Sequence, residues 1–408
     1  MRRITFWLSL VLIFIVPWED ALTITAIGSL ARLVGMIVAG FWILTILSEG
    51  RFRKPHLFHA FVFIFFLWEF VSYLWSIDVS RTVDRIITYG QIFILMLVVW
   101  ELYRKPADVI AGLQAYVLGS FVCIASTISN YLNGIIAVKY EVRYSATGVN
   151  AVDLSMLLLL GIPLAWHLFL VVDKETHPIL KMINLSYIPL AIFSIFLTGT
   201  RTSLFAIFPA IIFILMPKRF DIARYLLTFV FLLISFLVIR SILPAGVIER
   251  LSTAFTSITS EDIGGRVRLW REAAKVFLEH PLLGSGAGTM GTAIGAWAHQ
   301  TFLSILAETG LIGFVLFACI LAIVVNQAAR LLKKYSGLWF SIFYTWVIGV
   351  LSLSWETKKV TWLLLGFVII EGAALQEYYR SEKLKSTTSE TEKGQSLPNA
   401  VESKGLQI

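Results

Sequence analysis

Cationic residues and a histidine gather in one stretch of an otherwise apolar chain. Between Ile242 and Phe302 the sequence contains Arg266, Arg268 and His299, together with a loop punctuated by glycines. Clustered arginines suit an anionic phosphate leaving group, because a guanidinium can bind phosphate through two parallel hydrogen bonds. A neutral histidine suits the removal of a proton from a hydroxyl group. The stretch therefore predicts transfer of a group from a phosphate-linked donor to a hydroxyl acceptor.

His299 is the histidine in the best position for this chemistry. Of the six histidines, it alone is expected beside the arginines and at the start of an apolar helix. The positive end of a helix dipole disfavours the imidazolium form, so we expect the pKa of His299 to be lowered. The plainer alternative is an interfacial histidine with satisfied hydrogen bonds and no catalytic role.

The residues between the arginines and His299 predict an amphipathic helix followed by a turn. From Arg266 to His280 apolar residues recur at helical spacing, with the cations mostly on the other faces. We expect Trp270 and Phe277 to face lipid and the cations to face lipid headgroups. Alternating glycines in residues 284–288 provide a pliable turn, which by itself is weak evidence for a phosphate cradle.

Further candidates lie where other apolar stretches begin. Arg201 sits in a short turn at residues 198–203, where it either reaches lipid phosphate or points into a cavity and binds a phosphate. Asn150 can cap a helix, and Asp153 would then lie in its favourable first turn. Glu308, inside an apolar stretch, either pairs with a basic residue or helps to shape the site.

The composition predicts a polytopic membrane protein. Of 408 residues, 58% are hydrophobic and only 15% are charged, and the mean hydropathy is +0.80. The net charge of +8 comes from short clusters between apolar runs, which argues against a nucleic-acid partner. Cys123 and Cys319 lie inside apolar runs, and no metal-ligand motif or nucleotide-binding loop is present, so we predict no metal and no cofactor.

We expect an all-α fold with about twelve transmembrane helices and a long outward loop that contains amphipathic helices. Apolar length is the criterion, since a span needs about 20 such residues, or fewer when neighbouring helices shield it. The predicted spans are Ile4–Val16, Ile24–Leu47, Leu57–Leu74, Ile86–Val99, Val109–Ile128, Val149–Val172, Ile183–Leu197, Ser203–Met216, Ala223–Leu243, Phe302–Val325, Gly337–Leu353 and Thr361–Leu375.

The distribution of Lys and Arg predicts the orientation of these spans. Alternate connections are rich in cations, which marks them as cytoplasmic and places both termini on that side. We expect residues 1–380 to form one transmembrane domain whose outward catalytic segment is 244–301. Residues 381–408 are polar and predict a disordered cytoplasmic tail. The predicted cytoplasmic cations include Arg2, Arg3, Arg51, Arg53, Lys54, Arg104, Lys105, Lys181 and Arg330.

Several motifs together resemble the O-antigen ligase and polymerase superfamily. The C-terminal motif is the most specific, and the others are individually weak. The C-terminal motif consists of Gly265-Arg266 with Trp270, HPLLGSG at 280–286, Ala298-His299-Gln300 and LAETGLIG at 306–313. The individually weak motifs are Trp75-Ser76-Ile77-Asp78, the stretch Arg143…Gly148…Asn150 and Thr198-Gly199-Thr200-Arg201.

This resemblance implies a glycosyltransferase of the bacterial inner membrane. Members transfer a glycan from an undecaprenyl-pyrophosphate carrier on the periplasmic side, without nucleotide or metal. The resemblance assigns His299, Arg201 and Arg266 as catalytic residues, with Gln300 standing where the family often has Asn. Trp355-Glu356 is a second departure from the family pattern. We expect Arg268, Arg143, Asn150 and Gln300 to bind substrate.

The leading hypothesis is an O-antigen ligase that joins carrier-linked polysaccharide to lipid A-core. A polymerase of the same superfamily shares the donor and the motif, and is the main alternative. The absence of a large outer domain argues against a protein acceptor. The cationic amphipathic helix favours the ligase, because such a helix suits an anionic glycolipid acceptor. A transporter is a third interpretation, but no internal repeat is detectable in the sequence.

Overall fold

The computed structural model describes residues 1–24, 28–138, 141–172, 177–216, 222–254, 266–335 and 337–395. Gly264 and Gly265, which precede the amphipathic helix, lie outside these ranges. So do residues 255–263 of the expected catalytic segment and residues 396–408 of the expected tail.

The described chain is almost entirely helical, with one short hairpin of β1 (Thr23–Ile24) and β2 (Gly28–Ser29). Two 3-10 turns, η1 (Val16–Trp18) and η2 (Ser72–Leu74), follow α1 and α3. The helices are α1 (Arg2–Ile15), α2 (Leu30–Glu49), α3 (Leu57–Val71), α4 (Val79–Leu102), α5 (Pro106–Leu132), α6 (Ala151–Val171), α7 (Pro178–Leu197), α8 (Ser203–Ala206), α9 (Phe208–Leu215), α10 (Ile222–Ile242), α11 (Ala245–Ser252), α13 (Arg266–Glu279), α14 (Met290–Ile294), α15 (Thr301–Tyr335), α16 (Leu338–Val350) and α17 (Lys359–Gln395).

The all-α polytopic class is confirmed, and each predicted apolar stretch contains a helix, although the stretch Ile24–Leu47 begins in the β1–β2 hairpin and becomes helical at Leu30. Within the described ranges, eight helices are long and apolar enough to cross a membrane. A ninth span is possible if α10 and α11, bent by 117°, are taken together. The remaining apolar stretches form α1, the pair α8 and α9, and α16, which are short. The count of twelve spans therefore stays a prediction.

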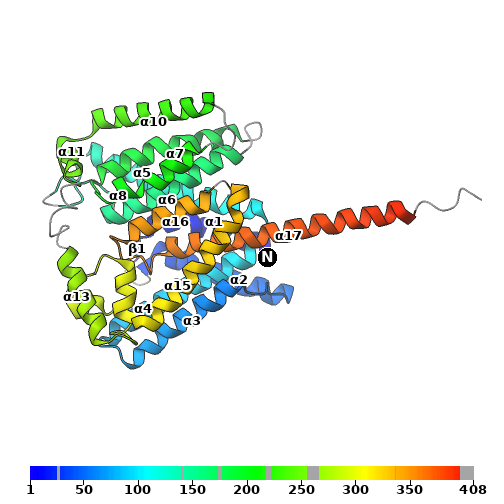
Figure 1. Ribbon diagram of the computed structural model, residues 1–408, viewed down its shortest axis with the longest axis horizontal. Helices are drawn as coiled ribbons and strands as arrows, with labels where there is room; N and C mark the ends of the chain where they lie inside the picture. Colours follow the sequence, from blue (N-terminus) through cyan, green and yellow to red (C-terminus); the bar gives the residue numbers. More distant parts are fainter. Residues whose placement is uncertain are drawn as a thin grey trace, which may run out of the picture.

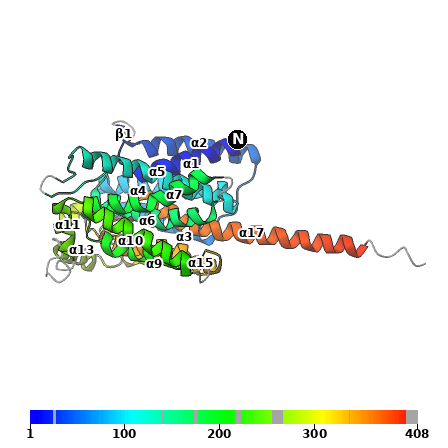
Figure 2. The ribbon, with the colours of Figure 1, turned by 90° about the horizontal axis from the view of Figure 1, so that it is seen from above.

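Helix α6 lies at the centre of the bundle. Its membrane-spanning window is 78% buried, because α5, α7 and α16 pack around it. Figures 1 and 2 show α11 and α13 at one end of the bundle and the N-terminus at the other. Helix α17 projects from the N-terminal end and continues to Gln395, beyond Ser381 where we expected regular structure to stop.

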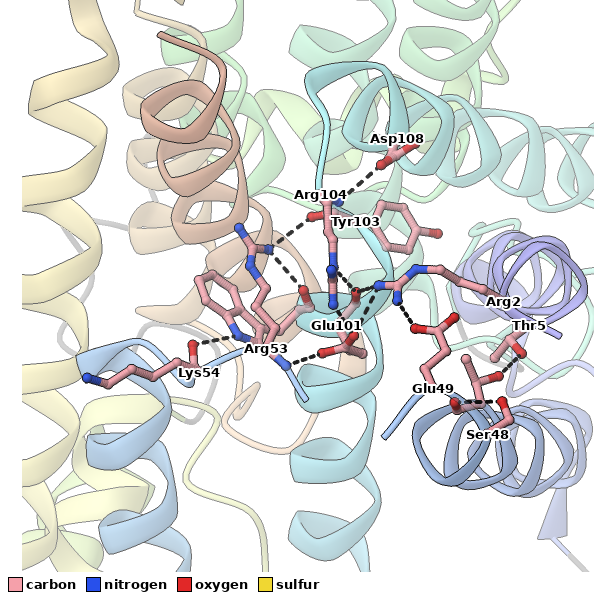
Figure 3. Close-up of polar contacts among 12 residues, drawn as sticks. Arg2, Thr5, Ser48, Glu49, Arg53, Lys54, Glu101, Tyr103, Arg104 and Asp108 are labelled. Atoms are coloured by element: carbon pink, nitrogen blue, oxygen red, sulfur yellow. Dashed lines mark hydrogen bonds and ion pairs between the residues drawn. The ribbon is translucent and has the colours of Figure 1, made fainter. Parts of the chain in front are cut away.

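A buried carboxylate ties the helices together at the end that carries the N-terminus (Figure 3). Glu101, near the end of α4, is 1% exposed. It accepts hydrogen bonds from the backbone N–H of Arg53 at 2.6 Å and from the guanidinium of Arg2 at 3.0 Å, and it also pairs with Arg104. Cations expected in different cytoplasmic connections thus meet at one end, opposite α13.

Helix α15 is interrupted at Gly310, where the backbone leaves helical geometry (φ 66°, ψ −169°). The break exposes carbonyl groups that the loop before α14 uses. Ser285 and Gly286 donate their N–H groups to the carbonyls of Ala307 and Glu308 at 3.0 and 2.9 Å. The loop is therefore fixed against α15, and this contact shapes the end of the bundle that holds α13.

Candidate active site

A cavity of about 840 Å³ lies at the end of the bundle that carries α13. Its walls come from the first half of α4, the start of α6, the start of α13, the loops around α14 and the segment between α16 and α17. The lining residues are Arg81, Asp84, Arg85, Thr88, Asn150, Val152, Asp153, Arg266, Arg268, Leu269, Gly288, Ala296, Trp297, His299, Leu353, Ser354, Glu356, Thr357 and Lys358.

Helix α13 delivers Arg266 and Arg268 to this cavity. Its polar face is exposed, and its apolar face packs on α14 and α15, where Ala273 is fully buried. The indole N–H of Trp270 donates to the carbonyl of Ala298 at 3.1 Å, one residue before His299. Helix α13 is thereby joined directly to the segment that carries the histidine.

The expected direction of the α13 apolar face was wrong. We expected Trp270 and Phe277 to face lipid, whereas Trp270 bonds to the loop before α15 and Phe277 packs against a buried cluster that includes Ala273 and Met290. The pattern identified the helix and its faces correctly. It could not distinguish lipid from protein as the apolar partner, because both are equally apolar.

His299 lies in the cavity wall two residues before α15 begins, where it is partly exposed. Its φ of 50° is unusual for a residue other than glycine, a form of strain that is frequent at functional sites. Partial burial lowers the pKa of the imidazole, the positive charge of Arg266 lowers it further, and Asp153 opposes the shift. The expected direction of the shift is therefore present, with burial and Arg266 as its causes.

Two of the cations in the cavity wall are neutralised by carboxylates. Lys358 lies 3.2 Å from Asp153 and 3.1 Å from Asp20. Burial acts to lower the pKa of Lys358, but these carboxylates outweigh it, so the pKa is raised. Arg85 likewise pairs with two acids, as described below.

The other three cations of the wall form no ion pair with an acid in the part of the chain that the structure describes. These are Arg81 on α4 and Arg266 and Arg268 on α13. Burial lowers the pKa of Arg266, yet a guanidinium remains protonated in proteins. The cavity therefore offers positive charge from two helices to an anionic ligand.

Arg201 and Arg143, two of the predicted site residues, do not line this cavity among the described residues. The guanidinium of Arg201 donates to the carbonyl of Arg250 at 3.3 Å and to the hydroxyl of Thr253 at 2.8 Å. These atoms lie at the C-terminal end of α11, where free carbonyls attract cations. Arg143 is buried and donates to the carbonyl of Thr198 at 2.8 Å, so it holds the turn that precedes Arg201.

Asn150 and Gln300 both cap helices. The side-chain oxygen of Asn150 accepts the N–H of Val152 at 2.8 Å, as the sequence predicts, and Asn150 also lines the cavity. The side-chain oxygen of Gln300 accepts the N–H of Leu303 in the first turn of α15. Gln300 is not among the cavity-lining residues described, so its local contact is structural.

The glycine loop binds a protein carboxylate where we considered a phosphate cradle. The N–H groups of Gly288 and Met290 donate to the carboxylate of Glu308 at 3.0 and 3.1 Å. The N–H of Ala287 donates to the hydroxyl of Ser72 at 3.0 Å. Since these donors are already used, the loop has a structural role, and the cradle interpretation is corrected.

Glu308 pairs with a basic residue, as one of our two interpretations required. One guanidinium nitrogen of Arg85 lies 3.5 Å from Glu308, and the other lies 3.0 Å from Glu356. All three side chains are buried.

We did not name Arg81, Arg85, Glu356 or Lys358 as site residues. The signal that was available is the polar face Arg81, Asp84, Arg85 and Thr88 at helical spacing in an otherwise apolar helix.

The fold and cavity define a helical polytopic membrane protein with a cationic site at one end of its bundle. A family model described as O-antigen ligase matches residues 187–318, a range that includes Arg201, Arg266, Arg268 and His299. The resemblance stated from the motifs is thereby confirmed over this range. Members are glycosyltransferase-like enzymes, ligases or polymerases, that act on lipid-linked polysaccharide in a membrane. No curated protein matches the chain.

Proposed function

We propose that this protein is an O-antigen ligase that transfers polysaccharide from undecaprenyl pyrophosphate to lipid A-core. The observation that carries the proposal is the meeting of His299, Arg266 and Arg268 in one cavity, with no carboxylate partner for either arginine among the described residues. We place this cavity on the periplasmic side of a bacterial inner membrane, because the cation-rich connections gather at the opposite end.

In the proposed reaction, His299 accepts the proton of the acceptor hydroxyl while its oxygen attacks the anomeric carbon of the donor. The bond from that carbon to the pyrophosphate oxygen breaks, and the pyrophosphate leaves with the electron pair. Attack from the side opposite the leaving group inverts the linkage. Arg266 and Arg268 offset the negative charge that develops on the leaving group.

The remaining predicted residues enter the proposal in different ways. Asn150 lines the cavity and keeps its amide N–H₂ for a sugar hydroxyl, because only its oxygen is used in capping. Arg201 is included through the family resemblance, with Arg143 holding its turn. Gln300 supports the start of α15, next to His299.

A polymerase of the same superfamily is the second candidate. The packing of α13 on α14 and α15 favours it, because an apolar face buried in protein no longer argues for a glycolipid acceptor held by that helix.

A transporter fits less well. Transporters tend to bind substrate near the membrane midplane, whereas this cavity is built largely from helix ends and loops at one end of the bundle.

Purified protein supplied with carrier-linked glycan and a lipid acceptor tests the proposal. We expect a new glycolipid product, and we expect His299→Ala to lower the rate by about 10²–10⁴-fold, since it removes the general base. Correct insertion of the variant is checked by its elution and thermal unfolding. Near-normal transfer by inserted His299→Ala would exclude the base assignment, and absence of any product from the wild type would return the transporter to consideration.

A further inference from the structure

Helix α4 places two arginines one turn apart on the wall of the cavity. Arg81 and Arg85 are four positions apart in the sequence, so they lie on the same face of the helix. They are the same residue type in the same cavity, but their surroundings differ. Arg81 is exposed and Arg85 is 7% exposed. This difference indicates separate tasks.

The charge of Arg85 is committed to the protein. Its two terminal nitrogens lie 3.0 Å from Glu356 and 3.5 Å from Glu308, and its guanidinium lies 5.9 Å from the ring of Trp297. Glu69, 1% exposed on α3, has one oxygen without a partner among the described residues, and so has Glu356. Arg85 is one positive charge beside at least two buried carboxylates. If its guanidinium turned toward a ligand, these buried acids would lose their partner.

The two partners of Arg85 belong to the segments that build the cavity. The carboxylate of Glu308 holds the loop before α14, through the N–H groups of Gly288 and Met290. Glu356 is followed by Thr357 and Lys358 in the cavity wall, and it is preceded by Trp355.

Trp355 links this segment to the other walls. Its backbone N–H donates to the hydroxyl of Thr301 at 2.8 Å, two residues after His299, and its indole N–H donates to Asp153 at 2.8 Å. A shift of Arg85 would therefore be passed to the segments that carry His299 and Lys358.

Arg81 has the opposite character. It lines the cavity without an ion pair in the described parts of the chain, and so do Arg266 and Arg268 on α13. A pyrophosphate has two phosphoryl groups, and arginines on two helices can contact it from two directions. Guanidinium groups without carboxylate partners are the ones free to form charge-assisted hydrogen bonds to phosphate oxygens.

We propose that Arg81 binds the pyrophosphate of the donor and that Arg85 is a positioning residue, which acts through Glu308 and Glu356 without touching substrate. This inference rests on the proposed function, because it assigns the donor of that same cavity. It adds α4 to a phosphate site that the sequence placed only on α13 and at Arg201.

The full-length protein is tested with carrier-linked glycan as donor and with inorganic pyrophosphate as a competitor. For Arg81→Met we expect the donor KM and the pyrophosphate Ki to rise by about tenfold to a hundredfold, the loss of one or two charged hydrogen bonds. For Arg85→Met we expect kcat to fall by about 10²-fold through misplacement of the site, with the pyrophosphate Ki within about threefold of wild type.

Rescue separates positioning from general loss of structure. We expect Arg85→Lys to keep more activity than Arg85→Met, and Glu356→Gln to recover part of the kcat of Arg85→Met, because it removes an uncompensated acid. Glu101→Gln serves as the matched control, a buried acid at the other end of the bundle. It should lower the unfolding temperature without changing the pyrophosphate Ki.

Each failure has a distinct signature. If wild type transfers glycan and Arg81→Met leaves KM and Ki within twofold, the Arg81 assignment is wrong. If Arg85→Met raises Ki as much as Arg81→Met does, Arg85 contacts ligand and the positioning role is wrong. If wild type forms no product, the proposed function fails, and stabilisation by inorganic pyrophosphate against heat still tests Arg81. Stabilisation of wild type that Arg81→Met loses supports the phosphate site, and equal or absent stabilisation excludes it.

Discussion

His299 must be neutral to accept a proton, so its pKa sets the pH range in which the proposed chemistry operates. Burial and Arg266 lower that pKa, and Asp153 raises it. The proposed rate should therefore fall as the pH decreases through the lowered pKa and the imidazole becomes charged. Substitution of the two neighbours moves this acidic limb in opposite directions.

We predict that Asp153→Asn shifts the acidic limb of kcat/KM to lower pH, because it removes a charge that favours imidazolium. Arg266→Gln should shift the limb of the remaining activity to higher pH, because it removes a charge that disfavours imidazolium. The measurement is kcat/KM against pH for wild type and both variants. A profile that is flat in the acidic range, or a shift of both variants in one direction, would contradict the general-base role.

At the scale of residues, the sequence predicted the charged core of the cavity better than its walls. Arg266, Arg268 and His299 belong to one continuous stretch of sequence, and they meet because α13 packs on the neighbouring helices α14 and α15. Arg85 meets Glu356 across 271 positions of the chain. Such a pair depends on how α4 packs beside the segment before α17, which hydrophobic periodicity does not determine.

At the scale of elements, the loop before α14 and the break in α15 depend on each other. Gly310 has φ 66° and ψ −169°, a conformation that is essentially restricted to glycine. A Cβ atom there would lie 2.2 Å from the carbonyl oxygen of Leu282. Both the backbone and the loop therefore require glycine at this position.

We predict that Gly310→Ala destabilises the protein by about 1–3 kcal/mol from backbone strain alone, with more from the clash. Gly291 in α14 is the matched control, since its φ is not positive and a Cβ atom would meet nothing within 4 Å. Gly291→Ala should be neutral or stabilising, because alanine favours a helix. Thermal unfolding in detergent measures both. Equal unfolding temperatures for the two variants would show that the break does not need glycine.

The residue at which a helix starts could be predicted more reliably than the elements on which the helix packs. Asn150 has a specific capping geometry, so its side chain marked the start of α6 in the sequence. The apolar side of α13 gave a periodic pattern without identifying its partner, which proved to be α14 and α15. The glycines predicted a pliable turn but did not identify the group that its N–H donors bind, which is the carboxylate of Glu308.

At the scale of the whole molecule, the two ends of the bundle have different charge arrangements. The end with the N-terminus neutralises Arg2 and Arg104 on the buried Glu101 (Figure 3). The end with α13 has three arginines that form no ion pair in the described ranges, around a cavity of about 840 Å³. This asymmetry fits the proposed binding of an anionic donor at one end of the bundle.

Several of the apolar helices are short for a bilayer. Helix α16 has 13 residues, which corresponds to about 20 Å of helix against about 30 Å of hydrocarbon. Sequence length alone therefore left the number of spans open. Of the helices that pass the length criterion, α5 and α7 pack on α6, and the short helices α8, α9 and α16 pack on it as well.

The acceptor distinguishes a ligase from a polymerase, since donor chemistry is common to both. A ligase joins one carrier-linked chain to a different glycolipid, whereas a polymerase must hold two carrier-linked chains. At the end of the bundle that carries the cavity, the short helices include α11, α13 and α14, and we propose that this end holds one carrier-linked chain. We therefore predict ligase activity.

The deciding assay supplies purified enzyme with carrier-linked glycan, with and without lipid A-core, in buffer that contains a metal chelator. We expect glycan to appear on lipid A-core, and the chelator to have no effect, because the sequence contains no metal-ligand motif. A reaction without enzyme controls for spontaneous transfer, and His299→Ala should form product about 10²–10⁴-fold more slowly than wild type. A longer carrier-linked chain formed without lipid A-core would establish the polymerase. Activity lost in chelator and restored by one specific ion would show that the reaction needs a metal.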